Sequence, residues 1–344
     1  MKLYRNFADK IKLLNKQLPT PDMYAMPGGR AYRKLTGIYS SQAHVCSVGE
    51  EHIGTQRILK ARPKMHGGIY AGAAGLVNWG YVAAAKPSGV ILYDVNYAQS
   101  VFWDMMIKAA AKNEKLEDFL KFFRSSKLEF TLRMNAHLLG GVTTHHNNIP
   151  IPSFFYSGMF PYRMIDSIKH WLNGNLKWDS ERNDYRYSTE TGDRSWLTEE
   201  NYTVIHALAK NNAIGIMTLD VTNEPCFQQL GDCLRNEEFE LIDTENAEAP
   251  PQIVTNLGID ICYVSNIFSF LNDNTDWSER RLKTKGNEPI SEVAKRNIAS
   301  VMREGGIIIN DHTILDHTYK LVCPKWDDVT LLKYINGTTA LKPV

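Results

Sequence analysis

The chain has 344 residues, of which 22% are charged and 43% hydrophobic, and its formal net charge is +1. This composition is ordinary for a globular protein with a sizeable core. A charge so close to zero provides no strong field to gather nucleic acid or anionic lipid, so we expect no nucleic-acid partner. No apolar stretch approaches the roughly 18 residues of a membrane span, so we expect none.

The first 18 residues carry apolar side chains at helical spacing. Phe7, Ile11, Leu14 and Leu18 fall on one face of an amphipathic helix, and the charges between them argue against a signal peptide. We expect residues 1–66 to be an N-terminal extension of helix and loop, ahead of a main domain at 67–344.

The cysteines indicate a reducing compartment. The chain has 5, an odd number, and they are scattered without a C-x-x-C pair, which favours free thiols over disulfides. We therefore expect a cytoplasmic protein, although export without a cleaved signal would leave no trace in this sequence.

Residues 67–94 hold the pattern around which the rest of the chain is organised. A buried strand at 69–71 leads into a turn with Gly72 and Gly75, a helix at 77–85, and a second strand that ends in Asp94. Asp94 follows Gly72 by 22 positions, the spacing of a nucleotide-binding βαβ unit. Glycines allow close approach of a ligand to the backbone, and the carboxylate can accept both hydroxyls of a ribose.

Further alternation follows along the chain. Thr198 is the expected N-cap of a helix that runs to Lys210, and residues 243–258 are an expected acidic loop. The other expected helices are 97–112, 116–123, 164–172, 224–236 and 290–304, and the other expected strands are 214–219, 259–264, 307–310, 319–323 and 330–335.

This alternation predicts an α/β protein. We expect a Rossmann-like, mostly parallel sheet with helices on both faces and a terminal antiparallel strand pair. Residues 124–195 fit no repeating pattern and are interpreted as a helical and loop insertion. Ligands of such sheets lie beyond the carboxyl ends of the strands, where the chain places polar or glycine residues: Gly72, Asp94, Asp220, Ser265, Asn266 and Asn310.

The order of these motifs resembles class I S-adenosylmethionine-dependent methyltransferases. YAGAAG, ILYDVN, TLDVT, DICYVSN and MREGGIIIN are similar to the glycine motif and the four later strand motifs of that family. The run SWLTEENYTVIHALAKNNAIGIMTLDVTNE also resembles a little-characterised bacterial methyltransferase-like family.

The resemblance implies S-adenosylmethionine as cofactor and assigns roles to named residues. Gly72, Gly75, Asp94 and Asp220 would bind the cofactor, and Asn78 would substitute for an acid that the first motif lacks. The remaining implied contacts, on the acceptor side, are Ser265 and Asn266.

Each of these residues also has a purely structural interpretation. Asp94 and Asp220 could cap the helices that follow them, the glycines could form a plain turn, and Ser265 with Asn266 could form an Asx turn. No metal site is expected, because the spacing of Asp311-His312 and Asp316-His317 matches no known ligand motif.

The leading function is methyl transfer to an unknown small-molecule or protein acceptor. Transfer of the aminocarboxypropyl arm of S-adenosylmethionine is an alternative enzyme reaction on the same fold. A non-catalytic binding or effector module is the alternative outside enzymes, and a nicotinamide-dependent dehydrogenase is a weaker option.

Overall fold

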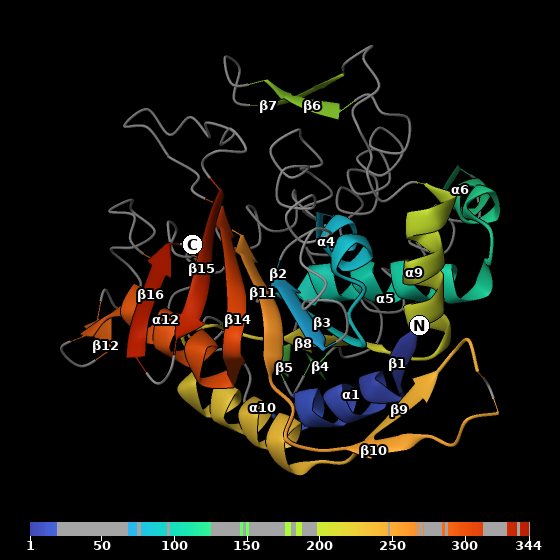
Figure 1. Ribbon diagram of the computed structural model, residues 1–344. Coiled ribbons are helices and arrows are strands. Elements are labelled where there is room, and N and C mark those ends of the chain that lie inside the picture. The colour runs from blue at the N-terminus through green and yellow to red at the C-terminus, as the bar shows by residue number, and fades with distance from the viewer. Residues whose placement is uncertain are drawn as a thin grey trace.

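The computed structural model describes residues 1–18, 68–73, 77–94, 97–124, 145–146, 149–150, 176–179, 184–187, 198–246, 248–265, 267, 271, 284–285, 288–311, 329–335 and 338–343. A seven-stranded sheet with the order β16-β15-β14-β11-β2-β3-β8 forms its centre (Figure 1). Neighbours from β14 to β8 run parallel, whereas β15 pairs antiparallel with both β14 and β16. In chain order the parallel strands read 3-2-1-4-5, the doubly wound order, so the predicted Rossmann-like α/β fold is confirmed.

The elements have the following bounds. The strands of the large sheet are β2 (Ile69–Ala73), β3 (Gly89–Asp94), β8 (Ile214–Thr218), β11 (Ile259–Ser265), β14 (Met302–Asp311), β15 (Val329–Ile335) and β16 (Thr338–Pro343). The helices are α1 (Phe7–Gln17), α4 (Val77–Ala85), α5 (Tyr97–Lys112), α6 (Leu116–Arg124), α9 (Glu199–Lys210), α10 (Glu224–Asn236) and α12 (Ile290–Val301). A three-stranded sheet combines β1 (Lys2–Arg5), β9 (Phe239–Asp243) and β10 (Gln252–Val254).

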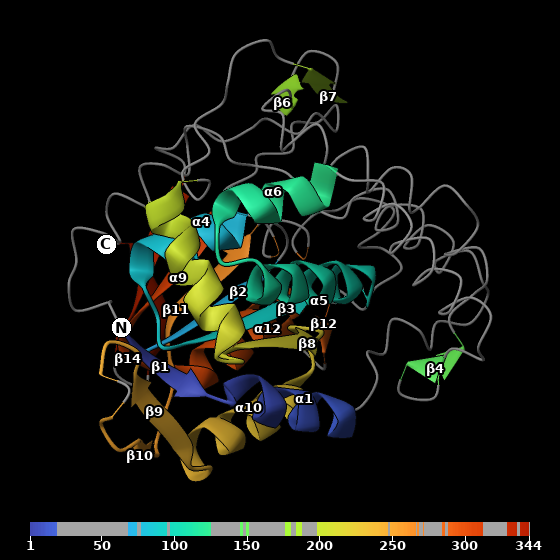
Figure 2. The same cartoon turned by 90° about the vertical axis from the view of Figure 1, so that its right-hand side faces the viewer.

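The central strands separate two apolar cores. Side chains alternate along a strand, so Leu92 of β3 packs with α4, α5 and α9, whereas its neighbour Ile91 packs with α1, α10 and α12. Figure 2 shows α5 and α6 on one side of the strands and α1 and α10 on the other. Because both faces are covered, the parallel strands are continuous apolar runs in the sequence.

The amphipathic N-terminal helix is confirmed, with one correction. Phe7, Ile11, Leu14 and Leu18 are all buried, as their spacing predicts. Residues 2–5, however, form strand β1 instead of the first turn of the helix. Asn6 separates the two elements with a left-handed backbone, φ 59°.

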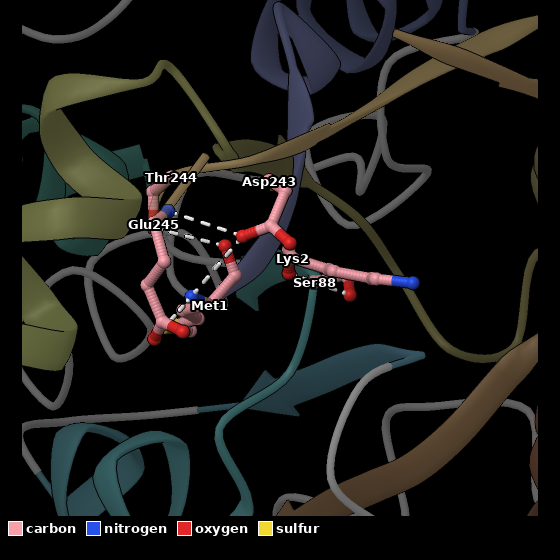
Figure 3. A network of polar contacts seen from close by, with 6 residues as sticks. All are labelled: Met1, Lys2, Ser88, Asp243, Thr244 and Glu245. Atoms are coloured by element: carbon pink, nitrogen blue, oxygen red, sulfur yellow. Dashed lines mark hydrogen bonds and ion pairs between the residues drawn. The ribbon is translucent and has the colours of Figure 1, made fainter. Parts of the chain in front are cut away.

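Strand β1 is fixed by pairing with β9, which the sequence analysis missed. Thr244 donates from both its backbone N and its Oγ1 to the Met1 carbonyl, each at 2.9 Å, and the Met1 ammonium lies 2.7 Å from Glu245 (Figure 3). Ser88 joins this network to the start of β3, because its Oγ donates to the Lys2 carbonyl at 2.9 Å. The expected loop at 243–258 is likewise corrected, since it contains β10, which pairs antiparallel with β9.

Most other predicted elements occur where expected. Helices α4, α5 and α10 have the predicted bounds, and Thr198 caps α9 by accepting a hydrogen bond from the Asn201 backbone N. Helix α12 ends at Val301, before the predicted 304, because Met302 pairs with Ile259 and begins β14 there.

Two expected elements, the helix at 164–172 and the strand at 319–323, lie outside the described residues. Within the expected insertion, β6 (Leu176–Asp179) pairs with β7 (Asp184–Tyr187), and β4 (His145–His146) pairs with β5 (Ile149–Pro150). The remaining short pair joins β12 (Thr284–Lys285) and β13 (Glu288–Pro289). Strand β16, which the sequence analysis did not predict, is the outer partner of β15.

Candidate functional site

The carboxyl edge of the sheet brings several predicted residues onto neighbouring strand ends. Ala73, which follows Gly72 at the end of β2, pairs with Tyr93, and Asp94 at the end of β3 pairs with Thr218 of β8. Asp220 follows two residues after Thr218. The first three strands of the doubly wound order therefore place Gly72, Asp94 and Asp220 at one edge of the sheet.

Asp94 belongs to a strand of the large sheet. It is the last residue of β3, and its side chain is half-buried. Its backbone carbonyl accepts a hydrogen bond from Leu219 N at 3.0 Å, which extends the pairing of β3 and β8 by one step. The position of the carboxylate is thus set by two strands rather than by a loop.

Asp220 lies in a tight turn between β8 and α10. Its Oδ1 accepts from the backbone N of Thr222 at 2.9 Å and from Thr222 Oγ1 at 2.8 Å, and the residue is only 8% exposed. The N-cap of α10 is Asn223, whose side chain accepts from the Cys226 backbone N. Asp220 therefore organises the turn before the helix and does not itself cap it.

The Asn78 side chain occupies the space that a side chain at position 72 would need. A Cβ on Gly72 would lie 1.7 Å from Asn78 Oδ1, so only glycine leaves room for the Asn78 amide. Asn78 is fully buried, accepts from the Tyr70 hydroxyl at 2.7 Å, and donates through Nδ2 to the Ala73 carbonyl at 2.8 Å. This amide ties the first turn of α4 to β2, which gives both residues a structural role whether or not a cofactor binds.

The remaining predicted site residues are only partly described. Ser265 is the last residue of β11, and its backbone pairs with Asn310 of β14, but its side chain lies outside the described residues. Gly75 and Asn266 also lie outside them. Their cofactor and acceptor roles stay predictions.

Behind this edge, a buried tyrosine links β3 to β11. The Tyr93 hydroxyl donates to the Tyr263 carbonyl at 3.2 Å and lies 3.6 Å from Cys262 Sγ. Burial raises the pKa of Tyr93 well above its usual value and raises the pKa of the Cys262 thiol to about 12. Because both groups stay protonated near neutral pH, they support the strands and supply neither a base nor a thiolate.

Three polar residues near Asp94 were missed in the sequence. Ser100 in α5 places its Oγ 3.2 Å from Thr218 Oγ1, and Asn15 in α1 accepts from Thr218 N at 3.0 Å through Oδ1. Helical spacing predicted α1 and α5. It carries no information on which polar side chain of a helix meets a given strand end.

A different carboxylate lies at the amino edge of the same sheet. Asp260 accepts from Ile69 N at 2.8 Å and from Arg303 Nη1 at 3.1 Å, at a register shift in β11. A Cβ on Gly68 would lie 2.1 Å from Asp260 Oδ2, and Gly68 has φ +70°. Burial raises the pKa of Asp260, while the Ile69 N–H and the Arg303 guanidinium act to lower it.

Within the part of the chain that the structure describes, no group of three or more His, Cys, Asp or Glu residues could hold a metal ion. No helix of that part is long and apolar enough to cross a bilayer.

The sheet order and the covered faces define a Rossmann-like α/β protein. One family, described as a domain of unknown function (DUF7790), matches residues 54–248, which is more than half of the chain. The chain therefore belongs to the DUF7790 family. The match includes β2, β3 and β8, and with them Gly72, Asp94 and Asp220. None of the curated proteins compared with the chain matches it.

Proposed function

We propose that this protein binds S-adenosylmethionine and transfers its methyl group to an acceptor of unknown identity. The observation that carries the proposal is the position of Asp94. It is a half-buried carboxylate at the carboxyl end of the second strand, next to the strand that ends in Gly72-Ala73. In doubly wound folds an acid at this place accepts hydrogen bonds from the ribose of a bound nucleotide.

The residues at this edge fit an adenosine-bearing ligand in part. Asp94 offers carboxylate oxygens, which are acceptors for the two hydroxyl donors of a ribose. The turn at Asp220 is held by Thr222 and adds a second fixed element on the neighbouring strand. Gly72 fits less well as a point of close approach, because Asn78 fills the space beside it.

The proposed work of the chain is binding and orientation. S-adenosylmethionine supplies an electrophilic methyl group together with its own leaving group, so little acid–base catalysis is required. Asp94 would orient the cofactor through its ribose, and Ser265 and Asn266 would contact the acceptor. Holding the two reactants in line is the main source of rate enhancement in such a reaction.

Calorimetric titration of the full chain with S-adenosylmethionine tests the proposal, and a separate titration with NAD tests the alternative ligand. We expect saturable binding of S-adenosylmethionine and none of NAD. The opposite preference, or binding of neither, contradicts the proposal. After incubation with acceptor extracts, S-adenosylhomocysteine is the product of methyl transfer, whereas methylthioadenosine would indicate transfer of the aminocarboxypropyl arm.

The contact between Gly72 and Asn78 favours a second candidate, a non-catalytic module that keeps the fold. In that case the glycine exists to admit the buried amide, and no ligand approaches it. An unchanged melting temperature at saturating S-adenosylmethionine, together with a flat titration, would favour this module over the enzyme.

A further inference from the structure

Among the described residues, β8 is the last strand at one end of the large sheet, and helix α1 packs along it. The strand order ends at β8, so one row of its backbone groups faces away from β3. On that side the backbone N of Thr218 donates to Asn15 Oδ1 at 3.0 Å. The next amide, Leu219 N, points to the opposite side and donates to the Asp94 carbonyl at 3.0 Å.

Helix α1 lies along β8 from the amino edge to the carboxyl edge. Ala8 N donates to the Asn212 carbonyl at 2.9 Å, just before the strand begins. Ile11 packs against the middle of the strand, where a Cβ on Gly215 would come within 2.6 Å of it. Asn15 then reaches the last residue of the strand, so the contacts follow the same order in the helix and in the strand.

These contacts connect Asn15 to Asp94 through the end of β8. Thr218 is the Cα partner of Asp94, and its Oγ1 lies 3.2 Å from Ser100 Oγ on the other face of the sheet. The end of β8 is therefore held by Asn15 from the side away from β3, by Ser100 from α5, and by the carbonyl of Asp94.

We infer that Asn15 is a positioning residue for the proposed cofactor site, acting on Asp94 through Thr218 and Leu219. The inference rests on the proposed function for the identity of the ligand. Helix α1 therefore contributes to the site, because the end of β8 is less stable when the outward N–H of Thr218 has no acceptor.

The chemistry of the contact determines which substitutions test it. A backbone N–H can only donate, so the atom that faces Thr218 must be the amide oxygen of Asn15. Asn15→Asp keeps an acceptor of the same shape, whereas Asn15→Leu has a similar volume and no acceptor. Asn113→Leu is the matched control, because Asn113 is also half-buried and donates to the Ala109 carbonyl at 2.8 Å, beyond the far end of α5.

The experiment measures S-adenosylmethionine affinity, melting temperature and amide hydrogen exchange for the wild type and these three variants. We expect Asn15→Leu to weaken the affinity roughly fivefold, the loss expected for one hydrogen bond, and to speed exchange at Thr218 and Leu219. Asn15→Asp restores protection at both amides. Asn113→Leu lowers the melting temperature and leaves the affinity and both amides unchanged.

Two results would overturn the inference. One is an affinity for Asn15→Leu equal to that of Asn113→Leu, and the other is unchanged exchange at Leu219 in Asn15→Leu. A wild-type chain that does not bind S-adenosylmethionine would refute the proposed function instead. In that event the exchange at Leu219 still decides whether Asn15 holds the strand end beside Asp94.

Discussion

The two edges of the central sheet use aspartate in opposite ways. At the amino edge, Asp260 takes the place of a ladder acceptor, with Ile69 and Arg303 as its donors. At the carboxyl edge, Asp94 is the last residue of β3, and it joins the neighbouring strand through its backbone carbonyl, which accepts from Leu219 N. An aspartate in or beside a buried strand is therefore no indication of a ligand until its hydrogen-bond partners are known.

The largest effect on stability is expected at the contact between Gly72 and Asn78, because these two residues have a structural role at the carboxyl edge. Gly72→Ala places a Cβ on Asn78 Oδ1 and breaks its hydrogen bond with Tyr70. Overpacking and a lost buried hydrogen bond together should lower the free energy of unfolding by about 4 kcal/mol. Chemical denaturation followed by circular dichroism measures this change.

The double variant Gly72→Ala, Asn78→Ala separates the two interpretations of the glycine. If Gly72 serves Asn78, the alanine at position 72 should cost at least about 1 kcal/mol less when Asn78 is absent. Additive losses would contradict that pairing.

Asp94→Ala should lower the affinity for S-adenosylmethionine more than it lowers stability. Hydrogen bonds to a charged acceptor contribute about 1.5–3 kcal/mol, so loss of the ribose contact should weaken S-adenosylmethionine binding by roughly 100-fold. Titration calorimetry and thermal melting on the same sample measure the two quantities. A large fall in melting temperature with unchanged affinity would mean that Asp94 resembles Asp260, and the contrast between the edges would fail.

At the amino edge the opposite outcome is expected. Asp260→Ala leaves the buried Ile69 N–H without its acceptor and should lower the free energy of unfolding by about 2 kcal/mol, with S-adenosylmethionine affinity unchanged. Asp260→Asn keeps an acceptor oxygen and should lose less than the alanine variant. Equal losses in the two variants would show that the charge, and not the acceptor, is what the fold requires.

The raised pKa of Asp260 predicts the direction in which stability should change with pH. Burial raises the folded-state pKa of this carboxyl, so the folded protein binds its proton more readily than the unfolded chain does. The stability of the wild type relative to Asp260→Asn should therefore rise as pH falls through the raised pKa and level off below about 3.9. A relative stability that falls with pH over that range would contradict the assignment.

The sequence predicted the sheet well because buried parallel strands and amphipathic helices have strong local patterns. Val77–Ala85 and Glu224–Asn236 match the predicted helices, and the apolar runs around Ile91 and Ile308 are central strands. Strand β1 was missed because Leu3 and Tyr4 are both buried although they are neighbours, a pattern without period two. Its pairing with β9, more than 200 residues away in the chain, is invisible to local patterns.

The candidate site was predictable only as a set of strand ends. Glycine and acid spacing located Gly72 and Asp94, but no sequence pattern indicated that Asn78 fills the space beside Gly72. The contact from Asn15 to Thr218 depends on how α1 lies along β8, which is a property of tertiary packing. Strand order thus fixes where a site can be, and side-chain contacts decide what it can bind.

The smallest effect is expected for Arg303→Met, which removes the charged partner of Asp260 and keeps an apolar stem of similar length. The Arg303 side chain is 44% exposed and the Asp260 side chain 21%, so the ion pair is open to solvent and should contribute only about 0.5 kcal/mol. Because Arg303 acts to lower the pKa of Asp260, its removal should raise that pKa further. Titration of the Asp260 carboxyl by NMR, with stability measured at low and high salt, checks both effects. If the free energy of unfolding fell by several kcal/mol, the ion pair would be what holds the register shift in β11. The backbone hydrogen bond from Ile69 would then contribute less to the stability of the amino edge than the ion pair does.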